Sequence, residues 1–179
     1  MKSKIIALIV CLLYIQLSYA QTKTQIEYTL GVNHSLVENE FKFNGVRQSI
    51  STGVYVNFVN KNFHELRTGI LYQSKGAKLK GEPLKLNYIS IPLLYGMSIS
   101  KSGMFKLMIG PELDVLVNDN LNTFIEDRSL KTIDLALFLG FKSYFSHNLY
   151  YTVGVSLGKN EILENQKNKN IAISMGFVL

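Results

Sequence analysis

The sequence predicts an all-β fold: an eight-stranded antiparallel up-and-down transmembrane β-barrel that follows a signal peptide. Three observations predict it. Eight segments of the 179-residue chain alternate apolar and polar side chains with a period of two, which is the periodicity of strands. The connections between these segments alternate between long and short. One face of every segment is bulky and apolar, whereas the other carries small and charged residues, as in barrels that cross an outer membrane.

The start of the chain has the three parts of a secretory signal peptide. Two lysines among the first four residues precede an uncharged, mostly apolar run. Ser18 and Ala20 then place small residues ahead of a cut before Gln21. We therefore expect residues 1–20 to be cleaved and residues 21–179 to form one barrel domain. An uncleaved anchor is the alternative, but the apolar run is short for a membrane span.

Composition argues against several classes of protein. The net charge is +6, and no dense run of Lys and Arg accompanies it, so nucleic-acid binding is not expected. Cys11 is the single cysteine and lies inside the leader, so the mature chain has no cysteine for a disulfide or a thiolate metal site. P-loop, dinucleotide and metal-ligand patterns are absent from the sequence. We expect no cofactor, no metal and no enzymatic activity.

The first four expected strands each place large apolar side chains on one face. Their ranges are 24–33, 49–59, 63–74 and 86–99. The side chains on the apolar face are Ile26, Tyr28, Leu30 and Val32, then Ile50, Val54, Val56 and Phe58, then Leu66, Ile70 and Tyr72, then Ile89, Ile91, Leu93, Tyr95, Met97 and Ile99. The opposite face of each strand is small or polar, so each segment fits a half-apolar strand.

The second four expected strands repeat the rule. Their ranges are 105–117, 131–145, 149–157 and 170–179. The apolar face holds Phe105, Leu107, Ile109, Leu113, Val115 and Val117, then Ile133, Leu135, Leu137, Leu139 and Phe141, then Leu149, Tyr151, Val153, Val155 and Leu157, then Ile171, Ile173, Met175, Phe177 and Leu179. Lengths near ten residues suit tilted strands that cross a bilayer.

The apolar face is expected to contact lipid. A water-soluble barrel has large apolar side chains inside and charges outside, which is the reverse of this pattern. An apolar coat of this size would cause aggregation in water, but it suits a bilayer. A closed sheet also pairs its backbone groups within lipid. We expect outer-membrane lipid to surround the chain.

The lengths of the connections predict the orientation of the barrel. Four connections are long and polar, at about 34–48, 75–85, 118–130 and 158–169. Three are tight, at about 60–62, 100–104 and 146–148. Long loops of such barrels face the outside of the cell and short turns face the periplasm. Both termini of this bacterial outer-membrane chain are then expected in the periplasm, and the chain is expected to be a monomer.

Three local patterns resemble a known family. Gly69–Ala77 closes the third expected strand, Tyr88–Tyr95 forms much of the fourth, and Gly110-Pro111-Glu112 interrupts the fifth. In order and spacing these patterns resemble the PorT-like outer-membrane β-barrels of Bacteroidetes over nearly all of the mature chain. The resemblance implies a barrel fold and is structural, not catalytic. Some members serve a protein secretion system, but these three patterns do not carry that role.

Charged residues gather on the interior face. They are Glu27, Glu65, Arg67, Lys106, Glu112, Asp114, Asp134 and Lys142. An eight-stranded barrel is just wide enough to be filled by its own side chains, and an unpaired charge in a dry interior is costly. We therefore expect a network of ion pairs that plugs the lumen. Two alternatives stay open: a gate or narrow ion path, and acid–base catalysis by Glu112 and Asp114.

A hydrolytic site would need a histidine beside a nucleophilic serine or an acidic partner. His34 is the histidine at the expected outer end, and Ser35 and Glu38 are close to it in sequence. A lipid-modifying enzyme would therefore depend on His34 alone. The other two histidines fall at the expected periplasmic ends of strands.

The long loops are the expected contact surface. Phe41 and Phe43 lie in the first, and Phe124 and Ile125 lie in the third. An envelope or extracellular protein can bind such segments by strand addition. The sequence therefore favours a small outer-membrane barrel with a structural or surface-binding role. The alternative is a narrow pore or an accessory component of an envelope transport or secretion machine. A secreted soluble lipocalin-like binding barrel is less favoured, because such a barrel needs an apolar lumen and this one is charged.

Overall fold

A computed structural model describes residues 23–38, 45–60, 62–79, 82–120, 131–159 and 167–179. Its elements are β1 (Lys23–Glu38), β2 (Gly45–Val59), β3 (Glu65–Leu79), β4 (Glu82–Ser98), β5 (Phe105–Asp119), β6 (Ile133–Tyr144), β7 (Leu149–Gly158) and β8 (Lys167–Val178). Each strand pairs antiparallel with its neighbours in chain order, and the sheet closes into a barrel. The predicted eight-stranded up-and-down barrel is therefore confirmed. The expected signal peptide, 1–20, lies outside the described residues.

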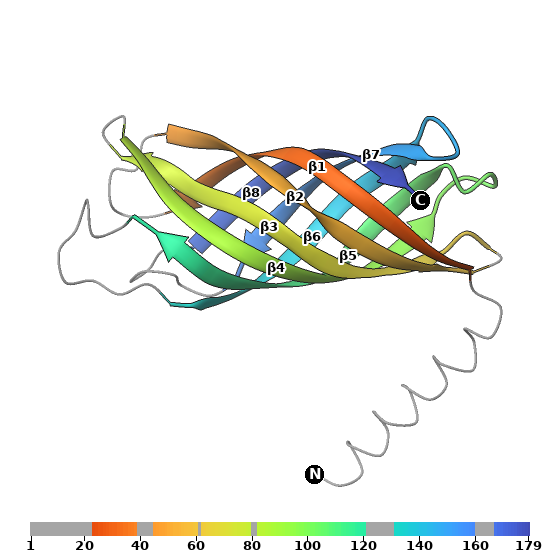
Figure 1. Cartoon of the computed structure of the whole chain (residues 1–179), viewed down its shortest axis with the longest axis horizontal. Helices are drawn as coiled ribbons and strands as arrows, with labels where there is room; N and C mark the ends of the chain where they lie inside the picture. The colour runs from red at the N-terminus through yellow and green to blue at the C-terminus, as the bar shows by residue number, and fades with distance from the viewer. Residues whose placement is uncertain (1–22, 39–44, 61, 80–81, 121–130, 160–166) are drawn as a thin grey trace, which may run out of the picture.

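The first and last strands close the barrel. β1 pairs with β8 from Glu27 opposite Val178 to Glu38 opposite Lys167. Figure 1 shows the eight strands wrapped around one long axis and tilted relative to it. Because the ladder runs around the whole barrel, the strands satisfy each other's backbone groups without a free edge, as lipid requires. No helix among the described residues is long and apolar enough to cross a membrane.

The two ends of the barrel differ. We call the end with the β2–β3, β4–β5 and β6–β7 connections the turn end, and the opposite end the loop end; β1 begins and β8 ends at the turn end (Figure 1). The first turn is held by Asn60, whose side-chain oxygen accepts hydrogen bonds from the backbone nitrogens of Asn62, at 2.9 Å, and His64, at 3.0 Å. Phe63 has a positive φ of 62°, which reverses the chain there.

The third and fourth strands are longer than the sequence pattern indicated. The prediction of a long loop over 75–85 is wrong, because β3 and β4 remain paired up to Leu79 opposite Glu82. β1 and β2 likewise extend to Glu38 and from Gly45, into the range expected to be a loop. These stretches are polar because several of their side chains point into the lumen. Polarity on the inner face of a barrel resembles the polarity of a solvated loop when only composition is considered.

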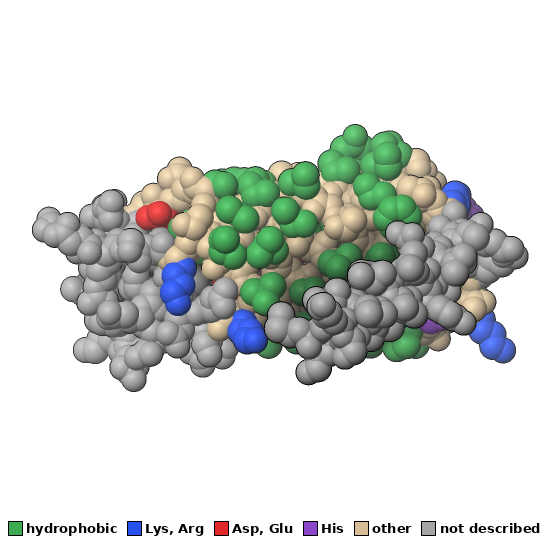
Figure 2. Space-filling model, turned by 90° about the horizontal axis from the view of Figure 1, so that it is seen from below, with side chains coloured by type: hydrophobic (Ala, Val, Ile, Leu, Met, Phe, Trp, Pro, Cys, Tyr) green, Lys and Arg blue, Asp and Glu red, His purple; other side chains and the backbone are tan. Residues whose placement is uncertain are grey.

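The exterior is apolar, as predicted. Side chains such as Leu139, Ile109 and Val153, in the middle of β6, β5 and β7, are exposed. Figure 2 shows hydrophobic side chains over the middle of the barrel surface and Lys or Arg side chains toward its two ends. This distribution matches a hydrocarbon slab with a polar boundary on either side.

Candidate functional site

The lumen holds ten buried charged side chains among the described residues. The acids are Glu27, Glu65, Glu112, Asp114 and Asp134, and the bases are Arg47, Arg67, Lys75, Lys106 and Lys142. Five negative charges therefore face five positive ones. Charges removed from water must be paired and hydrogen-bonded to be tolerated, so this balance is a condition for a filled barrel.

The first group of charges lies on the turn side, and we call Glu27, Glu65, Arg67, Lys106 and Lys142 the turn-side cluster. Lys142 Nζ donates to Glu27 Oε1 at 2.7 Å and to Glu65 Oε1 at 3.0 Å. Arg67 Nη2 lies 3.1 Å from Glu27 Oε2, and Lys106 pairs with Glu65. These contacts join β1, β3, β5 and β6 across the lumen, so the cluster links strands that are not neighbours in the sheet.

Tyrosine rings surround the turn-side cations. The Arg67 guanidinium lies 3.5 Å from the centroid of Tyr55, and its Nη2 donates to the Tyr150 hydroxyl at 2.8 Å. Lys142 Nζ lies 4.5 Å from the Tyr150 ring. Tyr144 donates to Glu27 Oε1 at 3.0 Å. Rings at these distances attract the cations and exclude water, which strengthens each ion pair.

The second group of charges lies nearer the loop end, and we call Lys75, Glu112 and Asp114 the loop-side cluster. Lys75 Nζ donates to Asp114 Oδ2 at 2.5 Å and to Glu112 Oε1 at 3.0 Å. Ser90 donates to Asp114, and Gln73 donates to Glu112 at 3.3 Å. Asp134 is buried on β6, where it pairs in register with Asp114. Glu112 and Asp114 thus both accept hydrogen bonds from protein donors.

An apolar layer separates the two clusters along β4, β5 and β6. Leu94, Met108 and Phe138 pack together there and are buried. The register places Met108 and Phe138 between the Lys106–Lys142 pairing and the Asp114–Asp134 pairing. The sequence prediction described the inner face as small, glycine-rich and charged, and it did not anticipate this layer. The layer places apolar side chains between the two charged clusters on these three strands.

Aromatic rings also fill the space beside glycines. A Cβ added at Gly176 would lie 2.0 Å from Cζ of Tyr150, and one at Gly154 would lie 2.3 Å from Cζ of Phe138. Only glycine leaves room for a ring at so close an approach to the neighbouring backbone. These two rings, with Tyr55, occupy the middle of the lumen.

The structure buries all eight charged residues for which the sequence predicts a lumen position. Seven of them join the two clusters, and Asp134 lies beside the loop-side cluster. Sequence reasoning missed Arg47 and Lys75. Lys75 continues the odd-numbered inner face of Glu65, Arg67 and Gln73, so the period-two pattern, extended past the expected strand end, would have found it.

Arg47 lies on the first part of β2, which begins at Gly45 and not at residue 49 as the sequence pattern indicated. It donates from Nη2 to Ser74 Oγ at 2.9 Å and from Nη1 to the Lys75 carbonyl oxygen. This contact fixes the loop-end parts of β2 and β3 to each other, just where their register shifts between Val46 and Ser51. Arg47 therefore supplies side-chain bonds where the ladder is irregular.

The candidate catalytic groups do not assemble. Ser35 is buried and faces inward, whereas His34 follows the outward parity of Val32 and Leu36, so the two lie on opposite faces of β1. Glu112 and Asp114 are buried and share one lysine, Lys75. Among the described residues no group of three His, Cys, Asp or Glu side chains is placed to hold a metal. Phe41, Phe43, Phe124 and Ile125 lie outside the described residues.

A closed barrel with an apolar exterior and a balanced, ion-paired interior defines an integral membrane β-barrel. The sequence matches the family described as outer membrane protein beta-barrel domain over residues 19–164, and the chain belongs to that family. No curated protein matches the sequence.

Solved structures share the fold. Neisserial surface protein A is 14% identical, with a TM-score of 0.60 over 87% of this chain and 98% of that one. Ail, the attachment invasion locus protein of Yersinia pestis, was solved in complex with the heparin analogue sucrose octasulfate. It is 11% identical, with a TM-score of 0.52 over 88% of this chain and 99% of that one. Ail in a phospholipid bilayer nanodisc is 13% identical, with a TM-score of 0.54 over 88% of this chain and 100% of that one.

Proposed function

We propose that this chain is a sealed outer-membrane barrel with a structural or surface-binding role, without enzymatic activity. The observation that carries the proposal is the set of buried, paired charges inside the barrel. Two ion-paired clusters and the apolar layer between them draw side chains from β1, β3, β4, β5 and β6. Arg47 on β2 donates a hydrogen bond to Lys75 and Tyr150 on β7 accepts one from Arg67, so both contact the clusters. A barrel of eight strands has little room left for a path once such residues are packed inside.

Ion conductance tests the seal. We expect the purified chain in planar bilayers to give no stable channels. The matched control replaces two acids and two bases of the turn-side cluster, Glu27, Glu65, Arg67 and Lys142, with serine, which leaves the net charge unchanged. This variant is expected to conduct ions, since it loses these ion pairs and their bulk. Stable single-channel currents from the unmodified chain would favour the narrow-pore alternative and overturn the seal.

The proposed orientation has the loop end outside the cell and both termini in the periplasm. Strands β1 to β5 have 15 to 17 residues, more than the roughly 9–11 that cross a bilayer. Because the turn end is tight, we propose that the excess length projects outward at the loop end. Surface protease treatment of intact cells tests this: cleavage at a tag inserted after Asp119 and not at one after Lys101 is expected, and the reverse pattern overturns it.

The loops are the proposed contact surface for an envelope or extracellular protein. Phe41, Phe43, Phe124 and Ile125 supply apolar side chains there, and extended segments favour strand addition. A photo-crosslinker at Phe124 is expected to capture a defined protein partner, whereas one at lipid-facing Leu139 is expected to capture lipid. Equal protein capture at both positions would contradict a loop-specific contact.

Two finer assignments complete the proposal. We propose that residues 1–20 are removed as a signal peptide, so mass spectrometry of the purified monomeric chain should give a mass beginning at Gln21. Within its family, the patterns at Gly69–Ala77, Tyr88–Tyr95 and Gly110–Glu112 support a place among the PorT-like barrels of Bacteroidetes. A mass that retains the leader would overturn the first assignment.

A further inference from the structure

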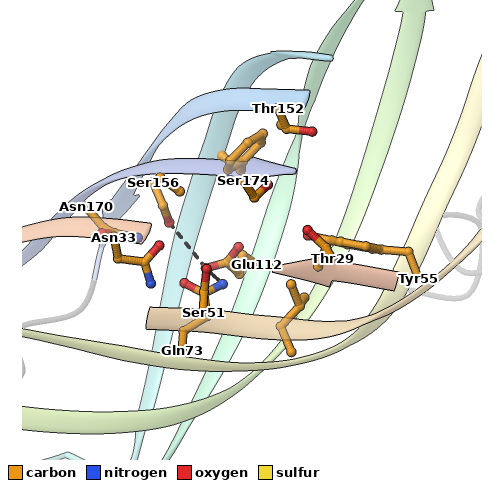
Figure 3. Close-up of a pocket in the computed structure, with 13 residues that line it drawn as sticks. Thr29, Asn33, Ser51, Tyr55, Gln73, Glu112, Thr152, Ser156, Asn170 and Ser174 are labelled. Atoms are coloured by element: carbon orange, nitrogen blue, oxygen red, sulfur yellow. Dashed lines mark hydrogen bonds between the residues drawn. The ribbon is translucent and has the colours of Figure 1, made fainter. Parts of the chain in front are cut away.

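A small cavity lies in the lumen beside the loop-side cluster. Its volume is about 30 Å³, and β1, β7 and β8 supply one of its walls while Gln73 and Glu112 line the other side. Figure 3 shows Asn33 and Asn170 on one side of this space and Glu112 near its middle. The wall formed by β1, β7 and β8 carries uncharged polar side chains here: Asn33, Asn170, Thr152 and Ser156.

Several polar atoms around the cavity have no protein partner. Both amide atoms of Asn33, both amide atoms of Asn170, and the hydroxyl of Thr152 are buried and unpaired. Asn33 is 0% exposed and Asn170 is 2% exposed. Burying such groups without hydrogen bonds is costly, and native proteins rarely leave so many together without a partner.

The strand register explains why the two amides meet. Asn170 lies opposite Ser35 on β1 and opposite Ser156 on β7. Asn33 lies opposite Ala172, two positions along β8 from Asn170, so the two asparagines are diagonal neighbours on one face. Ser156 in turn reaches Glu112 Oε1 at 3.4 Å across the cavity. Donors and acceptors thus surround one point from several strands.

We propose that this cavity is an internal hydration site that holds about two ordered water molecules between Asn33, Asn170 and Glu112. The size of the cavity decides the class of ligand. One water needs roughly 10–15 Å³ of such volume and two to four polar partners, so the space suits about two waters. A sugar, an amino acid or a hydrated ion would need far more room. The unpaired amides supply both the donors and the acceptors that water requires.

Aromatic rings on the turn side of the cavity separate these waters from the turn end of the lumen. Tyr55 and Phe138 line the cavity, and the Phe138 ring packs against Gly154 on β7. Tyr150 fills the space beside Gly176 further toward the turn end. The hydration site is therefore a closed pocket at its inner end, which gives its waters a long residence time. Internal water is independent of the seal, because a barrel can be closed to ions with or without it.

Nuclear magnetic resonance of the folded chain in detergent micelles tests the site. Water-selective nuclear Overhauser measurements are expected to give cross-peaks from long-lived water to the side-chain amides of Asn33 and Asn170. The Asn33→Leu/Asn170→Leu variant should lose the water cross-peaks at the backbone amides of Ser156 and Gln73. Asn33→Ser is a second variant that keeps a polar group and is expected to retain the water signal at Asn170.

Asn57 provides the matched control. Its amide is buried and lacks a protein partner, but it does not line this cavity. Asn57→Leu should leave the water cross-peaks at Asn33 and Asn170 unchanged. The proposal is overturned if both asparagines show no long-lived water, or if a crystal structure shows their amides bonded to each other or to protein groups. Loss of the signals in Asn57→Leu would also overturn it, since the water would then lie elsewhere.

Discussion

Lys75 contacts both carboxylates of the loop-side cluster, whereas each acid bound by Lys142 has another cation beside it. Glu27 also pairs with Arg67, and Glu65 also pairs with Lys106. Lys75→Met should therefore be the more damaging of two changes of equal size. Breaking a buried pair and leaving charge behind costs about 3–5 kcal/mol, so we expect that loss for Lys75→Met and a smaller one for Lys142→Met. Urea titration of folded chain in micelles measures both.

A rescue experiment checks the reason for this difference. In the Lys75→Met background, Glu112 and Asp114 lose their paired cation. The further changes Glu112→Gln and Asp114→Asn remove these two unpaired charges. The triple variant should recover much of the lost free energy of unfolding, because neutral amides are cheaper to bury than unpaired carboxylates. No recovery would mean that Lys75 acts through its packing and not through its charge.

Gly176 is required by the ring that packs against it. An added Cβ would lie 2.0 Å from Cζ of Tyr150, and that ring is buried. Gly176→Ala should lower the free energy of unfolding by about 1–3 kcal/mol, the usual cost of overpacking. In the Tyr150→Leu background the added methyl has space, so its effect should shrink. A double-mutant cycle with no coupling between the two positions would argue against this contact.

At the scale of the strand, lipid exposure should make the cost of charge depend on depth. Leu139 lies mid-strand on β6, opposite Ile109 and Val155, whereas Ile99 follows the last residue of β4 at the turn end. On the lipid face of a barrel, Arg costs about 2–4 kcal/mol at the bilayer midplane and about 0–1 near the interface. We therefore expect Leu139→Arg to be strongly destabilising and Ile99→Arg to be nearly neutral.

Unfolding titrations in phospholipid vesicles measure this pair of variants. Leu139→Ala is the control for lost apolar area, and it should cost less than the arginine variant. If Leu139→Arg and Ile99→Arg cost the same, the exterior of β6 would not be in contact with hydrocarbon. That result would return the soluble lipocalin-like barrel to consideration, although the charged lumen argues against it.

Strand ends were the elements that the sequence pattern located least well. Period-two alternation predicted the middle of every strand, because one face needs large apolar side chains and the other does not. The same alternation continues through Lys75 and Ala77, but the residues there are polar or small on both faces. Composition then favours a loop. These residues form a strand because β3 pairs with β4 up to Leu79 opposite Glu82. That pairing depends on a neighbouring strand and is not visible in the local sequence.

At the scale of the whole molecule, the closed ladder predicts a barrel that resists unfolding by detergent alone. Every strand has two neighbours, so no edge is available from which to start separation. An unboiled sample of the mature chain folded in micelles should migrate differently from a boiled sample on a gel, with a β-type circular dichroism spectrum before boiling. A chain that remains soluble without detergent and shows no shift would contradict the membrane barrel.

The sequence alone determined the class of fold, the lipid-facing residues and the charged character of the lumen. These follow from side-chain alternation, which is local: each strand reports its two faces without reference to any other strand. Eight lumen charges could be named for that reason, from Glu27 at the turn side to Asp134 near the loop side.

Tertiary structure decided which charges pair, where the lumen is apolar and where it is polar. Lys142 joins acids from β1 and β3, and Asn33 meets Asn170 only because β1 closes onto β8. Such contacts depend on the register between strands that are far apart in the chain. A shift of one residue turns every side chain to the other face, so closure of the barrel fixed the ion pairs, the apolar layer and the cavity together.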